Sequence, residues 1–156
     1  MAEKFGKTWW GEQWLQSLSQ IDYSNRIPRG LSYARNGAVQ NITVTENIVK
    51  AKVQGTHKYT VNLAVNKFTP KEVNNFIDKL LQYPAIISNL LNHQLDKEVL
   101  DLAKELKLMI FPNTWKDLQM NCSCPDWAVP CKHIAAVIYM ISKEIDNDPF
   151  LVLNNN

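Results

Sequence analysis

The chain has 156 residues, of which 46% are hydrophobic and 21% charged, and its formal net charge is +2. These values are typical of a soluble globular protein and argue against wholesale disorder. The longest purely apolar run, residues 134–141, is well short of the roughly 18 residues that a membrane helix needs. No apolar signal segment follows the N-terminus, so we expect a cytoplasmic protein without a membrane span.

Basic side chains are concentrated in the first half of the chain. Residues 1–70 contain nine Lys and Arg against four Asp and Glu, whereas residues 71–156 contain eight against eleven. A positive face that attracts phosphates is one interpretation. The other is that these side chains are scattered on solvated strand edges, where they oppose aggregation, and the modest excess favours this second interpretation.

The N-terminal segment predicts a helix. Thr8 is a suitable N-cap, and apolar residues follow it at helical spacing, namely Trp10, Trp14, Leu18 and Ile21. Trp9 lies beside this stripe. A buried anchor against the sheet is the favoured role for Trp9, and a surface that stacks on bases is the alternative.

Residues 26–65 predict a β-meander. Residues 26–30 are expected to form an extended turn, Asn36-Gly37 is typical of a hairpin, and Glu46-Asn47 offers a second turn. Apolar and polar residues alternate between and after these turns, with Ile42, Val44, Val49, Ala51, Val53, Tyr59, Val61, Leu63 and Val65 as the apolar members. We therefore expect about four antiparallel strands with one face covered by helices.

A helical middle segment follows. Residues 69–72, Thr-Pro-Lys-Glu, form a capping box with proline at the first helical position. An apolar stripe follows until Tyr83-Pro84 ends it, and its members are Val73, Phe76, Ile77, Leu80 and Leu81. Two more helices are expected over residues 86–93 and 96–107. Residues 110–113 break the pattern. We therefore expect an α+β domain over residues 1–112 and a small module over residues 113–153 that ends in an apolar helix.

The terminal module holds all three cysteines of the chain, Cys122, Cys124 and Cys131, and His133 follows two positions later. Three thiolates and one imidazole match a closed tetrahedral Cys₃His site for Zn²⁺. In an extended segment, side chains two positions apart point to the same side, so Cys122 and Cys124 can reach one ion. Cys131 and His133 converge only if Cys131 precedes a helix and His133 lies in its first turn.

Other uses of these cysteines are less consistent with the pattern. Metal-free cysteines need no such clustering, a Cys122–Cys124 disulfide closes a strained ring, and an iron–sulfur cluster with one His ligand is uncommon. A module of about 40 residues rarely folds on apolar burial alone, so structural zinc is expected to stabilise it. Cys131→Ser is then expected to melt the terminal helix and leave the meander largely folded. His57 and His93 stand alone and are expected to be ordinary surface or interface residues.

The Cys-x-Cys and Cys-x-His pairs, separated by six residues, resemble the SWIM-type zinc finger of bacterial proteins, remodeller-like ATPases and Mutator-type transposases. Other segments look like the bacterial branch, so the resemblance spans almost the whole chain: Trp9-Trp10-Gly11, residues 26–35, Val53-Gln54-Gly55 and residues 148–151. The resemblance implies a zinc-binding module that contacts DNA or proteins, often with helicase-like ATPases. Bacterial relatives are often longer at the C-terminus, so a further segment could hold part of the function.

Two functions are therefore expected. The first is a non-enzymatic zinc finger that binds nucleic acid beside a helicase-like ATPase, through Arg26, Arg29, Arg35, Lys116 and Lys132. Lys132 lies between two ligands, where it either meets a phosphate or offsets thiolate charge. The alternative is an adaptor that docks onto such an ATPase without contacting DNA, which the acidic second half favours mildly.

No enzyme or small-molecule substrate is expected. The sequence has no phosphate-cradling loop and no nucleophile–base arrangement, and a zinc ion with four protein ligands has no vacancy for a reactive water. Glu12, Asp22 and Asp126 are isolated carboxylates, which usually serve as solvated or capping groups.

Overall fold

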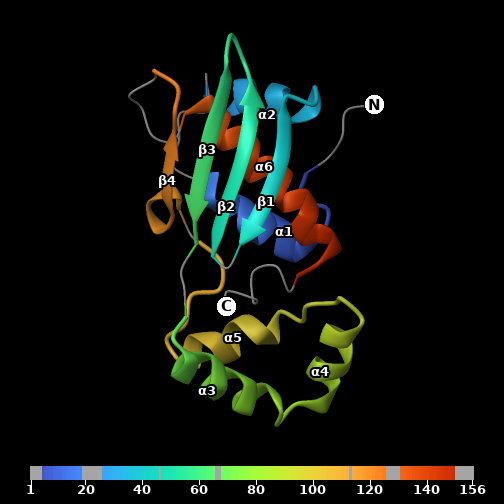
Figure 1. The fold of residues 1–156 in the computed structure, drawn as a ribbon. Coiled ribbons are helices and arrows are strands. Elements are labelled where there is room, and N and C mark those ends of the chain that lie inside the picture. Colours follow the sequence, from blue (N-terminus) through green and yellow to red (C-terminus); the bar gives the residue numbers. More distant parts are fainter. Residues whose placement is uncertain are drawn as a thin grey trace.

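A computed structural model describes residues 5–18, 26–45, 47–65, 68–112, 114–125 and 131–149. Ile21, Asp22, Glu46 and Asp126, to which the sequence assigned roles, lie outside these ranges. The fold is α+β, with a four-stranded antiparallel sheet, three helices on one face of it and a separate helical lobe (Figure 1). No helix within the described ranges has both the length and the apolar character to cross a membrane.

The sheet has the strand order β1-β2-β3-β4 and every neighbouring pair is antiparallel. Its strands are β1 (Val39–Thr45), β2 (Ile48–Gln54), β3 (Lys58–Ala64) and β4 (Gln119–Cys122). The predicted meander therefore supplies three strands, and the fourth comes from the segment that was expected to form a separate module. Alternation identifies a strand but not its partner, and β4 is too short to have shown a period of its own.

Residues 26–30, expected to be an extended turn, instead begin helix α2 (Arg26–Arg35). Pro28 does not prevent this, because proline is tolerated in the first turn of a helix, where its missing N–H has no intrahelical partner. Ile27 and Ala34 are buried by the fold. A Cβ atom on Gly30 would lie 2.7 Å from Cβ of Ala135, so glycine permits the close approach of two helices at this point. Tertiary packing therefore decides the conformation.

The Asn36-Gly37 turn joins α2 to β1 and does not close a hairpin. Gly37 has φ of +79°, which favours glycine, and the Ala38 N–H donates to Oδ1 of Asn36 and to the carbonyl of Tyr33. A turn is present at this dipeptide, but only Gly37 of the two residues has the positive φ that a type I′ turn requires at both, and the element before the turn is a helix. Such a turn is also the ordinary way for a helix to end, so the dipeptide alone does not distinguish the two.

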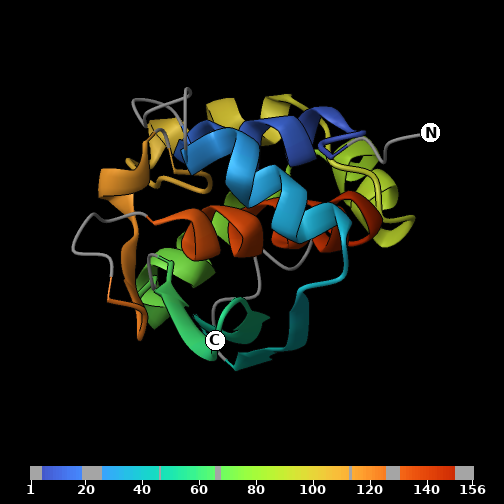
Figure 2. The ribbon, with the colours of Figure 1, turned by 90° about the horizontal axis from the view of Figure 1, so that it is seen from above.

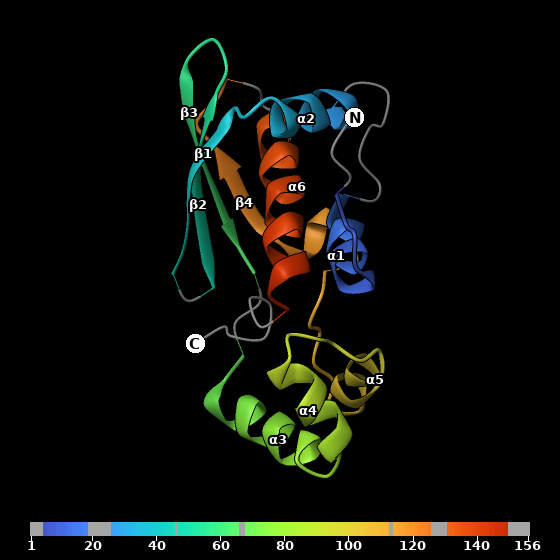
Figure 3. The same ribbon diagram turned by 90° about the vertical axis from the view of Figure 1, so that its right-hand side faces the viewer.

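Helix α6 (Lys132–Asn147) lies between the sheet and the pair formed by α2 and α1 (Trp9–Trp14), as Figures 2 and 3 show. It is buried on nearly every side, at Ile134, Ala135, Ala136, Val137, Ile138, Ile141, Ser142 and Ile145. Two tryptophans of α1 donate ring N–H hydrogen bonds to its carbonyls, Trp10 to Ile145 (2.7 Å) and Trp14 to Ile138 (2.9 Å). The boundary expected after residue 112 therefore does not separate two cores.

The helical lobe consists of α3 (Pro70–Leu80), α4 (Pro84–Leu91) and α5 (Glu98–Glu105). The capping box is present, because Thr69 Oγ1 accepts from the Glu72 N–H and the Glu72 carboxylate accepts from the Thr69 N–H. The apolar stripe is narrower than expected, since Ile77 and Leu81 are 46% and 62% exposed. Three short helices share one buried seam, which leaves the edge of the stripe in solvent.

Trp9 joins this lobe to the body of the molecule. Its ring N–H donates to the carbonyl of Leu95 (2.8 Å), and its ring lies edge-on to Phe111 with centroids 6.4 Å apart. Trp9 is thus an anchor and not an exposed stacking surface, but it anchors the lobe and not the sheet.

Candidate metal centre

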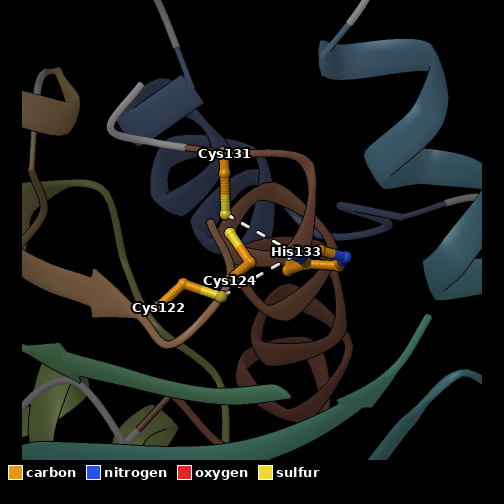
Figure 4. Close-up of side chains that lie close together, drawn as sticks. All are labelled: Cys122, Cys124, Cys131 and His133. Atoms are coloured by element: carbon orange, nitrogen blue, oxygen red, sulfur yellow. Dashed lines mark hydrogen bonds between the residues drawn. The ribbon is translucent and has the colours of Figure 1, made fainter. Parts of the chain in front are cut away.

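Four side chains meet where β4 ends and α6 begins (Figure 4). Cys122 is the last residue of β4, Cys124 follows two positions later, Cys131 is the N-cap of α6 and His133 is in its first turn. The ligand atoms of the four all lie within 4.8 Å of one another. Nδ1 of His133 is 3.8 Å from Sγ of Cys122 and 3.9 Å from Sγ of Cys131.

Local backbone structure explains this convergence. Cys122 pairs with Val61 in the sheet, and the next residue, Ser123, exchanges two hydrogen bonds with the backbone of Thr60. This continues the extended conformation, in which residues two positions apart share a side. Cys131 is extended, with φ −85° and ψ 176°, and α6 starts at the next residue. The change from extended to helical backbone turns the side chains of Cys131 and His133 toward one point.

The residues fit a zinc ion. Zn–S bonds of about 2.3 Å and Zn–N bonds of about 2.0 Å place sulfur and nitrogen roughly 3.5 Å apart in a tetrahedron. The two sulfur–nitrogen distances of 3.8 and 3.9 Å are within a few tenths of an ångström of that value. Three thiols and one imidazole are also a donor set that zinc prefers in structural sites. The four residues therefore form the ligand set of one structural Zn²⁺ ion.

The thiols influence one another's ionisation. The hydrogen bond from Cys122, aided by His133, lowers the pKa of Cys131 to about 4, against the effect of burial. The same hydrogen bond, together with burial, raises the pKa of Cys122 above its ordinary value. The thiolate of Cys131 is thus stabilised, whereas ionisation of Cys122 is made less favourable. A divalent cation that both sulfurs coordinate favours ionisation of both thiols, because it stabilises each thiolate that coordinates it.

A second layer of side chains holds the imidazole. The ring of His133 packs against the rings of Tyr33 on α2 and Tyr59 on β3, at centroid distances of 5.3 and 4.6 Å. Its Nε2 is buried and has no hydrogen-bond partner among the described residues. A Cβ atom on Gly55 would lie 3.3 Å from Nε2 and 3.0 Å from the Tyr59 ring. The hairpin between β2 and β3 therefore supports the imidazole from behind and orients Nδ1 toward the sulfurs.

Sequence reasoning missed these supporting roles. Tyr33 and Gly55 fall in segments that resemble the bacterial branch, but nothing in a single sequence shows that they contact His133. His57, expected to stand alone, is exposed and lies edge-on to Tyr59. His93 has Nδ1 3.7 Å from Oδ1 of Asp148, which is within ion-pair range when the ring is protonated.

The candidate nucleic-acid contacts fall into two places. Arg26, Arg29 and Arg35 are on α2, and the last two are exposed. Lys132 opens α6, and its carbonyl would lie 3.1 Å from a Cβ atom on Gly30, so this end of α6 touches α2.

Lys116 is separate from this group. It belongs to the 3₁₀ turn Trp115–Asp117, at the opposite end of β4 from Cys122, and its ammonium lies 5.8 Å from the Trp115 ring centroid. The other three basic positions with described side chains, Arg29, Arg35 and Lys132, are on α2 and the start of α6.

Comparisons with known proteins agree with the site. The SWIM zinc finger family matches residues 106–142, a range that contains all four ligands. A Mycobacterium tuberculosis protein named Uncharacterized protein Rv2102 is 36% identical over 149 residues, or 94% of this chain and 54% of the relative. The chain thus spans about half the length of the curated relative that it matches. No solved structure matches it. Residues 106–142 are thus similar to a SWIM zinc finger, and the matched segment contains the whole Cys₃His cluster.

Proposed function

We propose that this protein is a non-enzymatic zinc-binding module that binds nucleic acid and acts with a helicase-like ATPase of the chromatin-remodeller class in the cytoplasm. The observation that supports it best is the position of α2. This helix has three arginines and no acidic residue, and it packs on the end of α6 that supplies two zinc ligands. A basic helix beside a rigid metal site offers positively charged groups at fixed positions to phosphates.

Zinc also holds this basic helix in place. Tyr33 of α2 packs on the ring of His133, so a metal bound at Nδ1 fixes the surface against which α2 rests. Lys132 lies in the first turn of α6, where backbone N–H groups also favour an anion. A Cys₃His site with Zn²⁺ has a formal charge of −1, which Lys132 offsets in part.

A structural and not catalytic zinc is consistent with the ligand count. Four protein ligands complete the tetrahedron, and a catalytic zinc needs one position for water or substrate. The reducing cytoplasm keeps such thiols available for metal, which supports the proposed location. Hydrolysis of a nucleotide or cleavage of DNA by the purified, zinc-loaded chain would contradict the proposal.

The test is a titration of the zinc-loaded chain with labelled duplex and single-stranded DNA at several salt concentrations. Binding that weakens steeply with salt is expected, and R29E/R35E is expected to weaken it strongly. The matched control is K71E/K104E, which makes the same change of charge at exposed positions of the lobe. Absence of salt-sensitive binding at low ionic strength would refute the nucleic-acid function.

The lobe favours a second candidate, an adaptor that docks onto the ATPase without touching DNA. It exposes large apolar side chains, with Ile77 at 46%, Leu81 at 62% and Leu91 at 73% exposure. Apolar groups in solvent are typical of protein-binding surfaces when they lie together. Recovery of a helicase-like ATPase equally well before and after nuclease treatment, and its loss in L81S/L91S, would support this function over the first.

A further inference from the structure

The helices within the described residues cover only one face of the sheet. Figure 3 shows α6, α2 and α1 on one side of the strands and none of the described helices on the other. The strand register and burial alternate accordingly, since Val49, Ala51 and Val53 face the core. The outward face is formed by Gln40, Thr43 and Thr45 of β1, Ile48, Lys50, Lys52 and Gln54 of β2, Lys58, Thr60, Asn62 and Ala64 of β3, and Gln119 and Asn121 of β4.

This outward face has positive charge and no negative charge. Its charged members are Lys50, Lys52 and Lys58, and none of its described positions is Asp or Glu. Most of the remaining side chains are amides and hydroxyls, which donate hydrogen bonds without adding charge. Lys52 Nζ donates to Thr60 Oγ1 (2.6 Å), which holds this ammonium close to the sheet. The outward face would therefore attract a polyanion, and no carboxylate at its described positions would repel it.

The positions of two of the three lysines are not explained by the ordinary role of charges on a sheet. Lysine often protects edge strands from pairing with other chains. Here β1 and β4 are the edge strands, and neither contains a charged residue. Lys50 and Lys52 are on the central strand β2, which is paired with β1 on one side and β3 on the other. Lys58 begins β3, where only β2 is its ladder partner. The charge of Lys50 and Lys52 therefore protects no edge and indicates another role.

We propose that the outward face of the sheet is a second nucleic-acid surface, which contacts the sugar–phosphate backbone without reading bases. This inference rests on the proposed nucleic-acid function and assigns it to a new location. The described outward positions include no aromatic side chain on which bases could stack. Lysine ammonium groups bind phosphates as point charges, and the neighbouring amides and hydroxyls add hydrogen bonds.

The zinc site supports this face at its β4 edge. Ser123, between two of the cysteine ligands, exchanges hydrogen bonds with the backbone of Thr60, whose side chain binds Lys52. The arginines of α2 lie on the helical side of the sheet, so the two basic surfaces can be changed separately (Figure 3).

The experiment measures the salt dependence of DNA binding by K50Q/K52Q/K58Q. The probe is a fluorescein-labelled DNA duplex of about 20 base pairs, tested in two unrelated sequences, with the full zinc-loaded chain. We expect the slope of log K against log salt to fall by about 2 to 3, equally for both sequences, and affinity at low salt to fall about tenfold or more. The control K71Q/K104Q/K107Q removes as many charges from the lobe and is expected to leave the slope unchanged.

The outcomes separate this inference from the function on which it rests. If the unmodified chain shows no salt-sensitive binding, both fail. If it binds and the sheet variant keeps the full slope while R29E/R35E loses it, only the sheet surface is refuted. Equal lysine-dependent binding of poly-glutamate would also refute the assignment to nucleic acid. Circular dichroism and zinc content of each variant check that the fold is retained. We expect it to be retained in K50Q/K52Q/K58Q, because none of these three lysines is a core residue.

Discussion

The body of the molecule and its helical lobe are stabilised in different ways. In the body, one helix, α6, is buried between a sheet and two other helices, receives ring N–H bonds from two tryptophans and supplies two metal ligands. The lobe has three short helices around one seam and leaves several large apolar side chains in solvent. The metal ligands therefore lie on elements of the body, at the end of β4 and the start of α6.

Because the metal ligands lie on elements of the body, loss of zinc is expected to affect more than a terminal segment, and this is the largest effect that we predict. Cys131→Ser should release the ion and destabilise the whole body, because α6 contacts every strand of the sheet. Zinc binding is worth roughly 10–16 kcal/mol in small fingers, which is as large as the whole stability of a typical domain, about 5–15 kcal/mol. Zinc content and near-ultraviolet circular dichroism measure the result. A zinc-free variant that keeps its tryptophan signal would show that the metal stabilises only a terminal segment.

A pair of core truncations compares the two regions directly. Ile138 in α6 and Leu90 in α4 are both buried. Each change to alanine is expected to cost about 2–5 kcal/mol locally. Ile138→Ala should lower the unfolding temperature and speed the release of zinc to a chelator, because it loosens the ligand-bearing helix. Leu90→Ala should leave that release rate unchanged, and an equal increase in both variants would mean that body and lobe unfold as one unit.

The support behind His133 should control how firmly zinc is held. Tyr59→Ala removes the ring that stacks on the imidazole, and Gly55→Ala introduces a Cβ atom against Nε2. Loss of groups that orient a ligand typically lowers metal affinity by about 10–100-fold, and we expect this range for Tyr59→Ala. Competition with a chromogenic chelator measures the affinity. Tyr59→Phe is the control, since it keeps the ring, and unchanged affinity in Tyr59→Ala would remove this role.

The smallest effect is expected at the junction of the two regions. Trp9→Phe keeps an aromatic ring but loses the hydrogen bond to the Leu95 carbonyl, a change of about 0.5–1.5 kcal/mol. Hydrogen exchange should increase in α4 and α5 and stay unchanged in α6. Trp10→Phe, which loses its bond to Ile145 inside the body, should instead increase exchange near the end of α6. The same exchange pattern in both variants would contradict the division into body and lobe.

Metal ligation was the most predictable feature of this chain. Cys122 with Cys124 and Cys131 with His133 are identified by their chemistry and by a spacing within each pair that depends on local backbone conformation, whereas the meeting of the two pairs depends on the tertiary structure. The capping box at Thr69 and the turn at Gly37 are predictable for the same reason, since each involves neighbouring residues. The helix over residues 26–35 was missed because proline and glycine close together are typical of a turn, whereas Pro28 is tolerated in the first turn of α2 and Gly30 allows the close packing of α2 on α6.

The amino-acid sequence by itself determined the α+β class, the zinc ligands and the start of α6, because periodicity, capping and ligand spacing act over a few residues. Tertiary structure alone decided that β4 completes the sheet, that α6 is its central helix and that Tyr33, Gly55 and Tyr59 surround His133. It also placed the lysines on central strands. Such contacts join residues far apart in the chain, and no local pattern specifies which surfaces will meet.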